Sequence, residues 1–254
     1  SEVKMEVGQK FPLTIKRLGI NGEGVGFYKR NVVFVKGALP GEEVTVKLTK
    51  VQNKFAEAEI LNIRRASEDR IEPPCSVYAE CGGCQLQHMT YEAQLRNKRD
   101  IVMQALEKYL PEQADKLEVR PTIGMENPWN YRNKSSFQVR KEGKRVYAGL
   151  FAEGSHQLIN INNCLVQHPL TSKITVGVRK ILQKLNIPIY DGKTLNGLVR
   201  TIVVRTGLQT GETQVCLVTT RKDLPNKEEL MGGIKKIDPS IWSKTQKING
   251  EKPP

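Results

Sequence analysis

Apolar and polar residues alternate or cluster in five short runs over the first 65 residues, and turn signals such as Asn21-Gly22 and Pro40-Gly41 separate these runs. Each run is rich in β-branched and aromatic residues and none shows a helical period, so we expect five strands. The runs span residues 11–20, 24–29, 31–39, 41–52 and 55–64. Five strands in so short a stretch favour a small closed barrel of the OB type, because they are few for a two-sheet sandwich.

A polar stretch that ends in Pro73-Pro74 interrupts the strand pattern. A run with helical spacing of apolar residues follows at residues 91–110. Thr90 suits the N-cap of this helix and Pro111 ends it. The pattern therefore predicts one helix of about five turns after the barrel.

The pattern becomes mixed from about residue 118 onward. Strand-like runs occupy residues 134–140, 145–152, 156–161, 198–207 and 213–220, and helix-like runs occupy 171–186 and 226–237. Their irregular order predicts an α+β domain and not a regular βαβ array. We therefore expect a barrel domain at 1–66, a central α+β domain at 67–245, and a polar linker or truncated end at 246–254.

The net charge of the chain indicates which kind of partner it binds. Lys and Arg number 40 against 27 acidic residues, which gives a net charge of +13 and a pI near 9.5. Such a surplus indicates a polyanionic partner, with nucleic acid ahead of an anionic membrane surface. No apolar run approaches the length of a spanning helix, and the N-terminal residues are charged and unlike a signal peptide. We expect a cytoplasmic, monomeric protein that does not bind membranes.

Four cysteines form the strongest candidate for chemistry. Cys75, Cys81 and Cys84 lie within ten residues, and Cys164 lies far downstream. Four thiolates can hold a [4Fe–4S] cluster or a tetrahedral zinc ion, and a set of buried structural cysteines is the third reading. Three ligands from one loop and a distant fourth favour the cluster, because structural zinc more often comes from two close pairs.

The other candidate motifs are interpreted as structural features and not as functional sites. The glycines of residues 19–26 match neither a dinucleotide-binding loop nor a P-loop, so we expect a hairpin turn there. The three histidines lack metal-ligand spacing, and each is expected to be a hydrogen-bonded structural residue or a surface contact. Cys216 is flanked by apolar neighbours and is predicted to be a core residue of a strand. No nucleophile, catalytic acid–base pair or S-adenosylmethionine fingerprint is evident in the sequence.

Basic residues alternate with aromatic residues and amides in two segments of the central domain. The first segment contains Tyr131, Arg132 and Lys134, and the second contains Arg200 and Arg205. Arg and Lys contact phosphates, while rings and guanidinium planes stack on unpaired bases. These five residues are the candidate RNA contacts, and a solvated strand face is the alternative for each of them.

Together these features resemble the bacterial RNA (uracil-5-)methyltransferases, and most closely the 23S ribosomal RNA enzymes that begin with a TRAM domain. The resemblance covers nearly the whole chain. Residues 5–64 resemble the TRAM barrel, "CSVYAECGGCQLQHMTYEAQLRNK" resembles the cluster segment of the family, and "WNYRNKSSFQVR" and "LVRTIVVRTG" resemble its central RNA-binding domain.

The resemblance implies a [4Fe–4S] cluster on Cys75, Cys81, Cys84 and Cys164, and RNA near Tyr131. It also implies the reaction of the parent protein. A cysteine thiolate adds to C6 of uracil, C5 takes a methyl group from S-adenosylmethionine, and a base removes the C5 proton.

The family's catalytic C-terminal domain has no counterpart that we recognise in this sequence. We therefore expect this chain to be the RNA-recognition part of such an enzyme and inactive by itself. Two alternatives stay open: a non-catalytic RNA-binding iron–sulfur protein, and a methyltransferase for transfer RNA in place of ribosomal RNA. Electron transfer is disfavoured, because a redox carrier needs neither the barrel nor this much positive charge.

Overall fold

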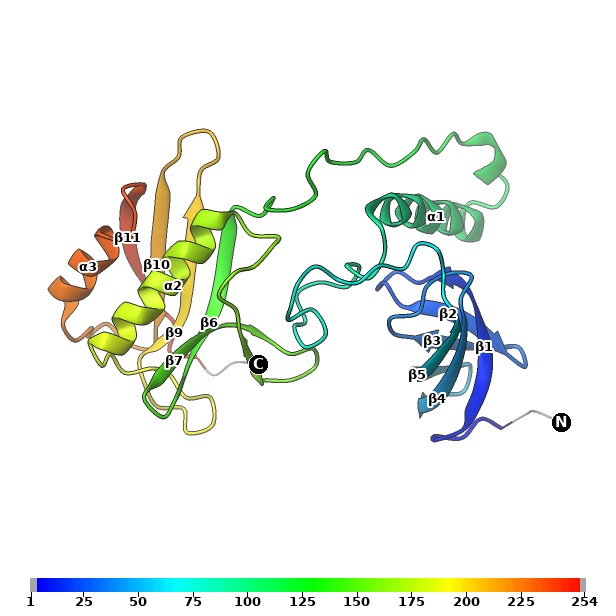
Figure 1. The fold of residues 1–254 in the computed structure, drawn as a ribbon, viewed down its shortest axis with the longest axis horizontal. Helices are drawn as coiled ribbons and strands as arrows, with labels where there is room; N and C mark the ends of the chain where they lie inside the picture. The colour runs from blue at the N-terminus through cyan, green and yellow to red at the C-terminus, as the bar shows by residue number, and fades with distance from the viewer. Residues whose placement is uncertain (1–3, 252–254) are drawn as a thin grey trace. The chain divides into compact units, whose positions relative to one another are not determined.

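A computed structural model describes residues 4–251 of the chain, which form two compact units (Figure 1). Unit 1 contains residues 4–74 and 84–125, and unit 2 contains residues 75–83 and 126–251. The chain therefore leaves unit 1 at residue 74, returns to it at residue 84, and leaves it again after residue 125.

A closed barrel of five strands forms most of unit 1, as the sequence predicted. The strands are β1 (Lys10–Leu18), β2 (Gly24–Tyr28), β3 (Asn31–Val35), β4 (Glu43–Val51) and β5 (Phe55–Arg65), in the order β1-β2-β3-β5-β4. Every pair is antiparallel except β3 with β5. Alternate residues fill the interior, which is lined by Phe11, Leu13, Ile15, Val33, Val35, Val44, Val46 and Leu48. This alternation explains why the period-two pattern predicted the barrel.

One glycine lets two barrel strands approach closely. A Cβ atom on Gly26 would lie 2.8 Å from the Leu13 side chain and 2.9 Å from the carbonyl oxygen of Thr14. The backbone oxygen cannot move away without breaking the register of β1 with β2, so a larger residue would disrupt the closure of the barrel here.

The helix α1 (Tyr91–Tyr109) belongs to unit 1, whereas the sequence placed it in the central domain. Thr90 caps it as predicted, because its hydroxyl accepts a hydrogen bond from the Ala93 N–H at 3.2 Å. Met89 and Ala93 pack with Leu18 and Leu39 in a small apolar cluster. This cluster attaches the start of the helix to the barrel, so the predicted boundary at residue 66 does not coincide with the observed division. A short 3-10 helix, η1 (Ala114–Lys116), follows α1.

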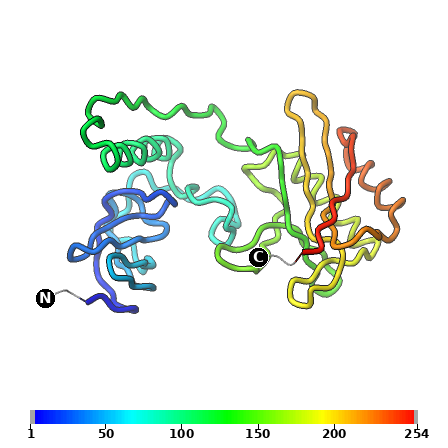
Figure 2. Tube along the Cα trace, turned by 180° about the vertical axis from the view of Figure 1, so that it is seen from behind, coloured from blue at the N-terminus to red at the C-terminus, as the bar shows by residue number. Residues whose placement is uncertain are grey.

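Unit 2 is an α+β structure built on a six-stranded sheet, as predicted, with the strand order β11-β10-β9-β6-β7-β8 (Figure 1). The strands are β6 (Lys134–Glu142), β7 (Arg145–Phe151), β8 (Leu158–Asn160), β9 (Val199–Thr206), β10 (Thr213–Thr219) and β11 (Ile241–Ile248). The helices α2 (Pro169–Lys184) and α3 (Lys227–Lys235) pack on one face of the sheet, and Figure 2 shows this unit from behind. Their apolar residues form the core with Phe137, Ile202, Val204, Val215 and Leu217.

The strand β11 was not predicted, and it overlaps the linker expected at residues 246–254. It pairs in parallel with β10, and Gln246 Nε2 donates to Thr219 Oγ1 at 2.8 Å. Only Ile241 of this strand is buried. A polar edge strand carries no local signal, because hydrogen bonds to its partner hold it in place and apolar alternation does not.

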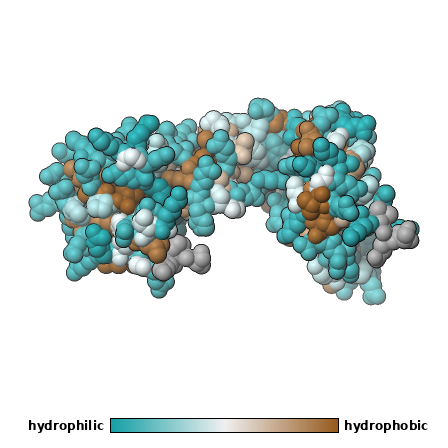
Figure 3. Space-filling view, turned by 90° about the horizontal axis from the view of Figure 1, so that it is seen from below, coloured by the Kyte–Doolittle hydropathy of each residue, from teal (hydrophilic) through white to brown (hydrophobic). Residues whose placement is uncertain are grey.

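The described helices include none that is both long and apolar enough to cross a membrane. The surface seen in Figure 3 is mainly hydrophilic on both units, with small apolar patches. This agrees with the charged composition of the chain.

Candidate functional site

The first two candidate cysteines lie in the segment Cys75–Gly83, here named the cysteine loop. Two backbone hydrogen bonds fold its first part into tight turns: the Tyr78 N–H donates to the Cys75 carbonyl at 3.2 Å, and the Cys81 N–H donates to the Val77 carbonyl at 2.8 Å. Both cysteines are half-buried.

The end of the cysteine loop is attached to the end of β7. Cys81 forms an isolated antiparallel bridge with Ala152, and the Gly82 N–H donates to the Phe151 carbonyl at 3.4 Å. The Gly83 N–H donates to the Cys81 sulfur at 3.3 Å. Backbone N–H groups aimed at sulfur favour a thiolate, and such bonds also tune iron–sulfur clusters.

Cys164 lies at the start of the segment that leads into α2. Its N–H donates to the Ser172 hydroxyl at 3.3 Å, and its carbonyl accepts from the Gln167 N–H at 3.1 Å. Cys164 and Cys81 both pack against the hydrophobic core of unit 2. Two cysteines separated by more than 80 residues thus belong to one compact unit and contact the same core.

Cys84 begins the second segment of unit 1 and is also half-buried. The segments on either side of the cysteine loop are joined to each other within unit 1. The Ile71 N–H donates to the His88 carbonyl at 3.1 Å, and the Thr90 N–H donates to the Asp69 carbonyl at 2.9 Å. The loop is therefore closed at its base by a short antiparallel pairing.

The donor chemistry of the cysteines fits a thiolate-bound iron–sulfur cluster. No cysteine forms a disulfide among residues 4–251, and one sulfur accepts a backbone hydrogen bond. The same residues contain no group of three or more Cys, His, Asp or Glu side chains arranged to hold a metal ion. Each thiolate of a [4Fe–4S] cluster binds a different iron, so a cluster needs a wider arrangement than one ion does.

The first basic segment lies beside the residues that follow Cys164. Asn130 adopts a left-handed conformation with φ 56°, and its side-chain Nδ2 donates to the Gln167 carbonyl at 2.9 Å. The Arg132 N–H donates to the Val166 carbonyl at 2.9 Å. Tyr131 between them is 46% exposed. These bonds hold the backbone of two candidate RNA contacts against the segment of the fourth cysteine.

Lys134 and Arg205 are direct neighbours in the sheet. They face each other in the antiparallel register of β6 with β9, and both side chains are exposed. The residues on either side of them, Ser135 and Val204, are buried toward the helices. Lys134 and Arg205 therefore lie on the face of the sheet opposite the helices, which we name the open face.

Arg200 reaches this region through a β-bulge. Val199 and Thr201 pair with consecutive residues of β10, so that Arg200 is the extra residue of β9. Its guanidinium lies 4.6 Å from the ring centroid of Tyr190, and the Arg140 guanidinium lies 5.5 Å from the same ring. Burial lowers the pKa of Arg140, and the nearby Arg200 charge lowers it further. The Arg140 guanidinium still stays charged at neutral pH.

The structure tests two further expectations from the sequence. Cys216 was expected in the core, and this was wrong: it is half-buried on the open face, because its neighbours Val215 and Leu217 take the core positions. His168 is structural as expected, because its Nδ1 accepts from the Leu170 N–H at 3.1 Å and caps α2.

The aromatic partners of Arg140 were missed by sequence reasoning. Tyr190 lies in the loop before β9, where no periodic pattern marks it, and Phe151 lies at the end of β7. The Arg140 guanidinium lies 5.4 Å from the Phe151 ring centroid. Only the pairing of distant strands brings these side chains together, so no local signal could have found them.

Residues 4–61 match the sequence model of the TRAM domain, which covers nearly all of the barrel. The chain is also 56% identical over 251 residues to a protein of Bacillus anthracis named an uncharacterized RNA methyltransferase. That match covers 99% of this chain and 54% of the relative. Proteins of the same name from Halalkalibacterium halodurans and from Listeria monocytogenes (serotype 4b) are each 54% identical, and each match covers 98% of this chain and 54% of the relative.

A solved structure has the same fold over most of this chain. It is the tRNA (uracil-54, C5)-methyltransferase of Pyrococcus abyssi in complex with S-adenosyl-L-homocysteine, with a TM-score of 0.63 and 24% identity. The match covers 86% of this chain and 48% of that chain. At this identity the likeness concerns the fold alone. The chain thus contains a TRAM barrel, is similar over nearly its whole length to curated RNA methyltransferases, and spans about half the length of those relatives.

Proposed function

We propose that this chain is the RNA-recognition part of an S-adenosylmethionine-dependent RNA uracil-C5 methyltransferase. One observation carries the proposal: 98–99% of the chain aligns, at 54–56% identity, with proteins named RNA methyltransferases. The TRAM barrel and the net charge of +13 support RNA as the partner. The fold shared with a uracil-C5 enzyme is consistent with the choice of reaction.

Ribosomal RNA is the substrate that we favour, and transfer RNA is the alternative. The presence of the barrel at the start of the chain is the reason, since the resemblance described above is closest to the TRAM-containing ribosomal enzymes. Transfer RNA stays the alternative because the tRNA enzyme from Pyrococcus abyssi has a related fold.

We further propose that Cys75, Cys81, Cys84 and Cys164 hold a [4Fe–4S] cluster. The half-buried thiols, the N–H group aimed at the Cys81 sulfur and the shared core under Cys81 and Cys164 support this. A bound cluster would link the cysteine loop to the segment before α2 and so stabilise both. Metal analysis that finds about four irons and four sulfides per chain would support the cluster. One zinc ion without sulfide would refute it and leave RNA binding intact.

Methyl transfer by this chain alone is not expected. The sequence contains no S-adenosylmethionine fingerprint. The matches span about half of the relatives and do not themselves identify which half performs catalysis. S-adenosylmethionine therefore enters the proposal as the methyl donor of the whole protein.

The test measures binding and methyl transfer on the same RNA. Transcripts of 23S ribosomal RNA and of tRNA, both without modifications, are titrated with the chain over a range of salt and then incubated with labelled S-adenosylmethionine. We expect binding that weakens steeply with salt, tighter binding to ribosomal RNA, and no label transfer. Affinity that stays flat with salt would contradict the RNA reading. Transfer of label would contradict the assignment of this chain as recognition only.

A further inference from the structure

The open face of the sheet in unit 2 carries polar and basic side chains. The helices α2 and α3 both pack on the opposite face, where they bury the core. The open-face positions between Lys134 and Arg140 come from β6, β9 and β10. None of these described positions is acidic, and all except Thr201 are half-buried or exposed. They are Ser136, Gln138, Thr201, Val203, Gln214, Cys216 and Val218. This face offers no apolar layer for a third helix, and its charge is positive.

Basic residues stand at both ends of this face. Lys134 and Arg205 are paired at the start of β6, and Arg140 and Arg200 meet over Tyr190 near its other end. Lys134 and Arg140 are six residues apart on one strand, which corresponds to about 20 Å at the rise of a β-strand. A single-stranded nucleic acid of a few nucleotides spans this length.

Several contacts hold the side chains of Arg140 and Arg200 in place. Tyr190 is only 4% exposed, and both guanidiniums stack against its ring. Arg200 Nη1 donates to the carbonyls of Asn249 and Glu251 at 3.0 and 2.6 Å. These contacts restrict both long side chains before any ligand binds, so little rotamer entropy remains to be lost on binding.

The charge at this end of the face is positive after its neighbours are counted. Asp191 lies close enough to affect Arg140 electrostatically, and Glu142 on the same face of β6 is paired with Arg145 of β7. No ion pair links either arginine to a carboxylate among the described residues. Two like charges held near one ring repel each other, and an anion placed between them would relieve that repulsion.

We propose that the open face is a track for single-stranded RNA, which runs along β6 and β9 from Lys134 and Arg205 to Arg140 and Arg200. The proposal rests on the proposed function and identifies the surface that performs the RNA recognition. The four basic residues contact phosphates along this path. The Phe151 carbonyl accepts a hydrogen bond from the Gly82 N–H of the cysteine loop, so the track ends beside that loop.

The test compares two double variants that each remove two positive charges. Arg140→Ala with Arg200→Ala changes the open face, and Lys180→Ala with Lys184→Ala changes exposed positions of α2 on the opposite side. Each full chain is titrated with a labelled oligouridine of about ten nucleotides. We expect the open-face variant to bind about tenfold more weakly or worse. Its slope of log affinity against log salt should fall by about 1.4, which corresponds to two phosphate contacts.

Arg140→Lys separates the shape of the guanidinium from its charge. It keeps the positive charge, so the salt slope should stay the same. Affinity should fall because Lys lacks the planar fork that packs against the Tyr190 and Phe151 rings and binds a phosphate with two donors. A thermal melt of each variant shows whether the sheet is intact. Ultraviolet cross-linking of the wild-type chain to the same oligouridine should modify peptides of β6, β7 or β9.

The outcomes distinguish the track from the proposed function. Equal losses in the two double variants would mean that RNA binding follows total charge, and the track would be refuted. Unchanged binding by a folded open-face variant would place the RNA elsewhere on the chain, and the proposed function would stand. A wild-type chain that binds neither the oligouridine nor ribosomal RNA would refute both.

Discussion

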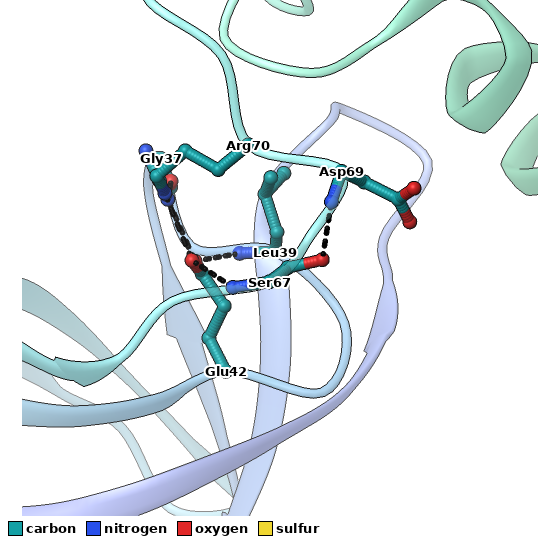
Figure 4. Close-up of polar contacts among 6 residues, drawn as sticks. All are labelled: Gly37, Leu39, Glu42, Ser67, Asp69 and Arg70. Atoms are coloured by element: carbon teal, nitrogen blue, oxygen red, sulfur yellow. Dashed lines mark hydrogen bonds and ion pairs between the residues drawn. The ribbon is translucent and has the colours of Figure 1, made fainter.

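Glu42 and Arg70 form a bidentate ion pair inside unit 1 (Figure 4). Arg70 Nη2 donates to Glu42 Oε1 at 2.6 Å, and Arg70 Nε donates to Glu42 Oε2 at 2.8 Å. The carboxylate also accepts from the backbone N–H groups of Leu39 at 2.7 Å and Ser67 at 3.0 Å. Four donors thus satisfy a side chain that is fully buried, and they tie the chain that follows β5 back to the barrel.

Replacement of Glu42 by Gln should lower the free energy of unfolding of unit 1 by roughly 3 kcal/mol, because the change leaves the Arg70 charge without a partner. Arg70 keeps its bond to the Gly37 carbonyl but loses the anion beside it. Urea titration at pH 7 measures the loss. Glu59→Gln, at an exposed position of β5, is the matched control and should change stability by less than about 0.5 kcal/mol. A Glu42→Gln chain as stable as this control would show that the pair contributes nothing.

The same pair predicts how stability depends on pH. Burial by itself would raise the pKa of Glu42, but the hydrogen bonds from Arg70, Ser67 and Leu39 and the Arg70 charge lower it below its ordinary value of 4.5. A lowered carboxyl pKa contributes stability that is complete above the unfolded pKa and is lost as pH falls through the folded pKa.

Acid titration of the urea midpoint therefore tests this coupling. The wild-type chain should lose stability progressively below about pH 4.5, and Glu42→Gln should have a flatter profile in that range. The difference between the two proteins should shrink toward low pH, because protonation removes the same charge that the mutation removes. Parallel profiles at all pH values would contradict the assigned coupling.

The barrel was predictable because its signals are local. The strands β1 and β4 alternate, and Pro40-Gly41 and similar pairs mark the turns within a few residues of the strands that they join. The place of α1 was not predictable. Its spacing shows an apolar stripe but not which domain covers it, and Ala93 and Leu18, which belong to one apolar cluster, are 75 positions apart.

The candidate site also combines features that the sequence shows with features that only the pairing of distant segments creates. The identity of the cysteines is visible in the sequence, whereas the bridge of Cys81 to Ala152 depends on a partner 71 positions away. Arg200 was recognisable as a basic residue of a strand. Its bulge and its meeting with Tyr190 were not, because they follow from the pairing of β9 with β10 and from the loop before β9.

Cys81→Ser should remove the proposed cluster. The serine oxygen is a poorer ligand for iron than a thiolate, and the bond from the Gly83 N–H to sulfur is lost as well. Iron and acid-labile sulfide on anaerobically purified protein should fall well below about four of each per chain, and the melting temperature should fall with them. Cys216→Ser, on the open face, is the control and should keep both values. Full iron content and unchanged melting in the Cys81 variant would exclude it as a ligand.

The double change Arg132→Ala with Lys134→Ala should weaken RNA binding more than Cys216→Ser does. Both basic side chains are exposed, and together they remove two charges from the segment beside Cys164 and the start of β6. The loss should be about tenfold at low salt and should shrink as salt rises. Filter binding to the same ribosomal RNA fragment measures it.

Cys216→Ser is a demanding comparison for this prediction, because Cys216 lies on the open face and its substitution changes neither charge nor size appreciably. If RNA lies along this face, contacts at Cys216 are close to neutral and the phosphate contacts of Arg132 and Lys134 dominate. A larger effect of Cys216→Ser would mean that binding depends on close packing at the middle of the sheet. That result would move the RNA contacts away from the basic segment and toward β10.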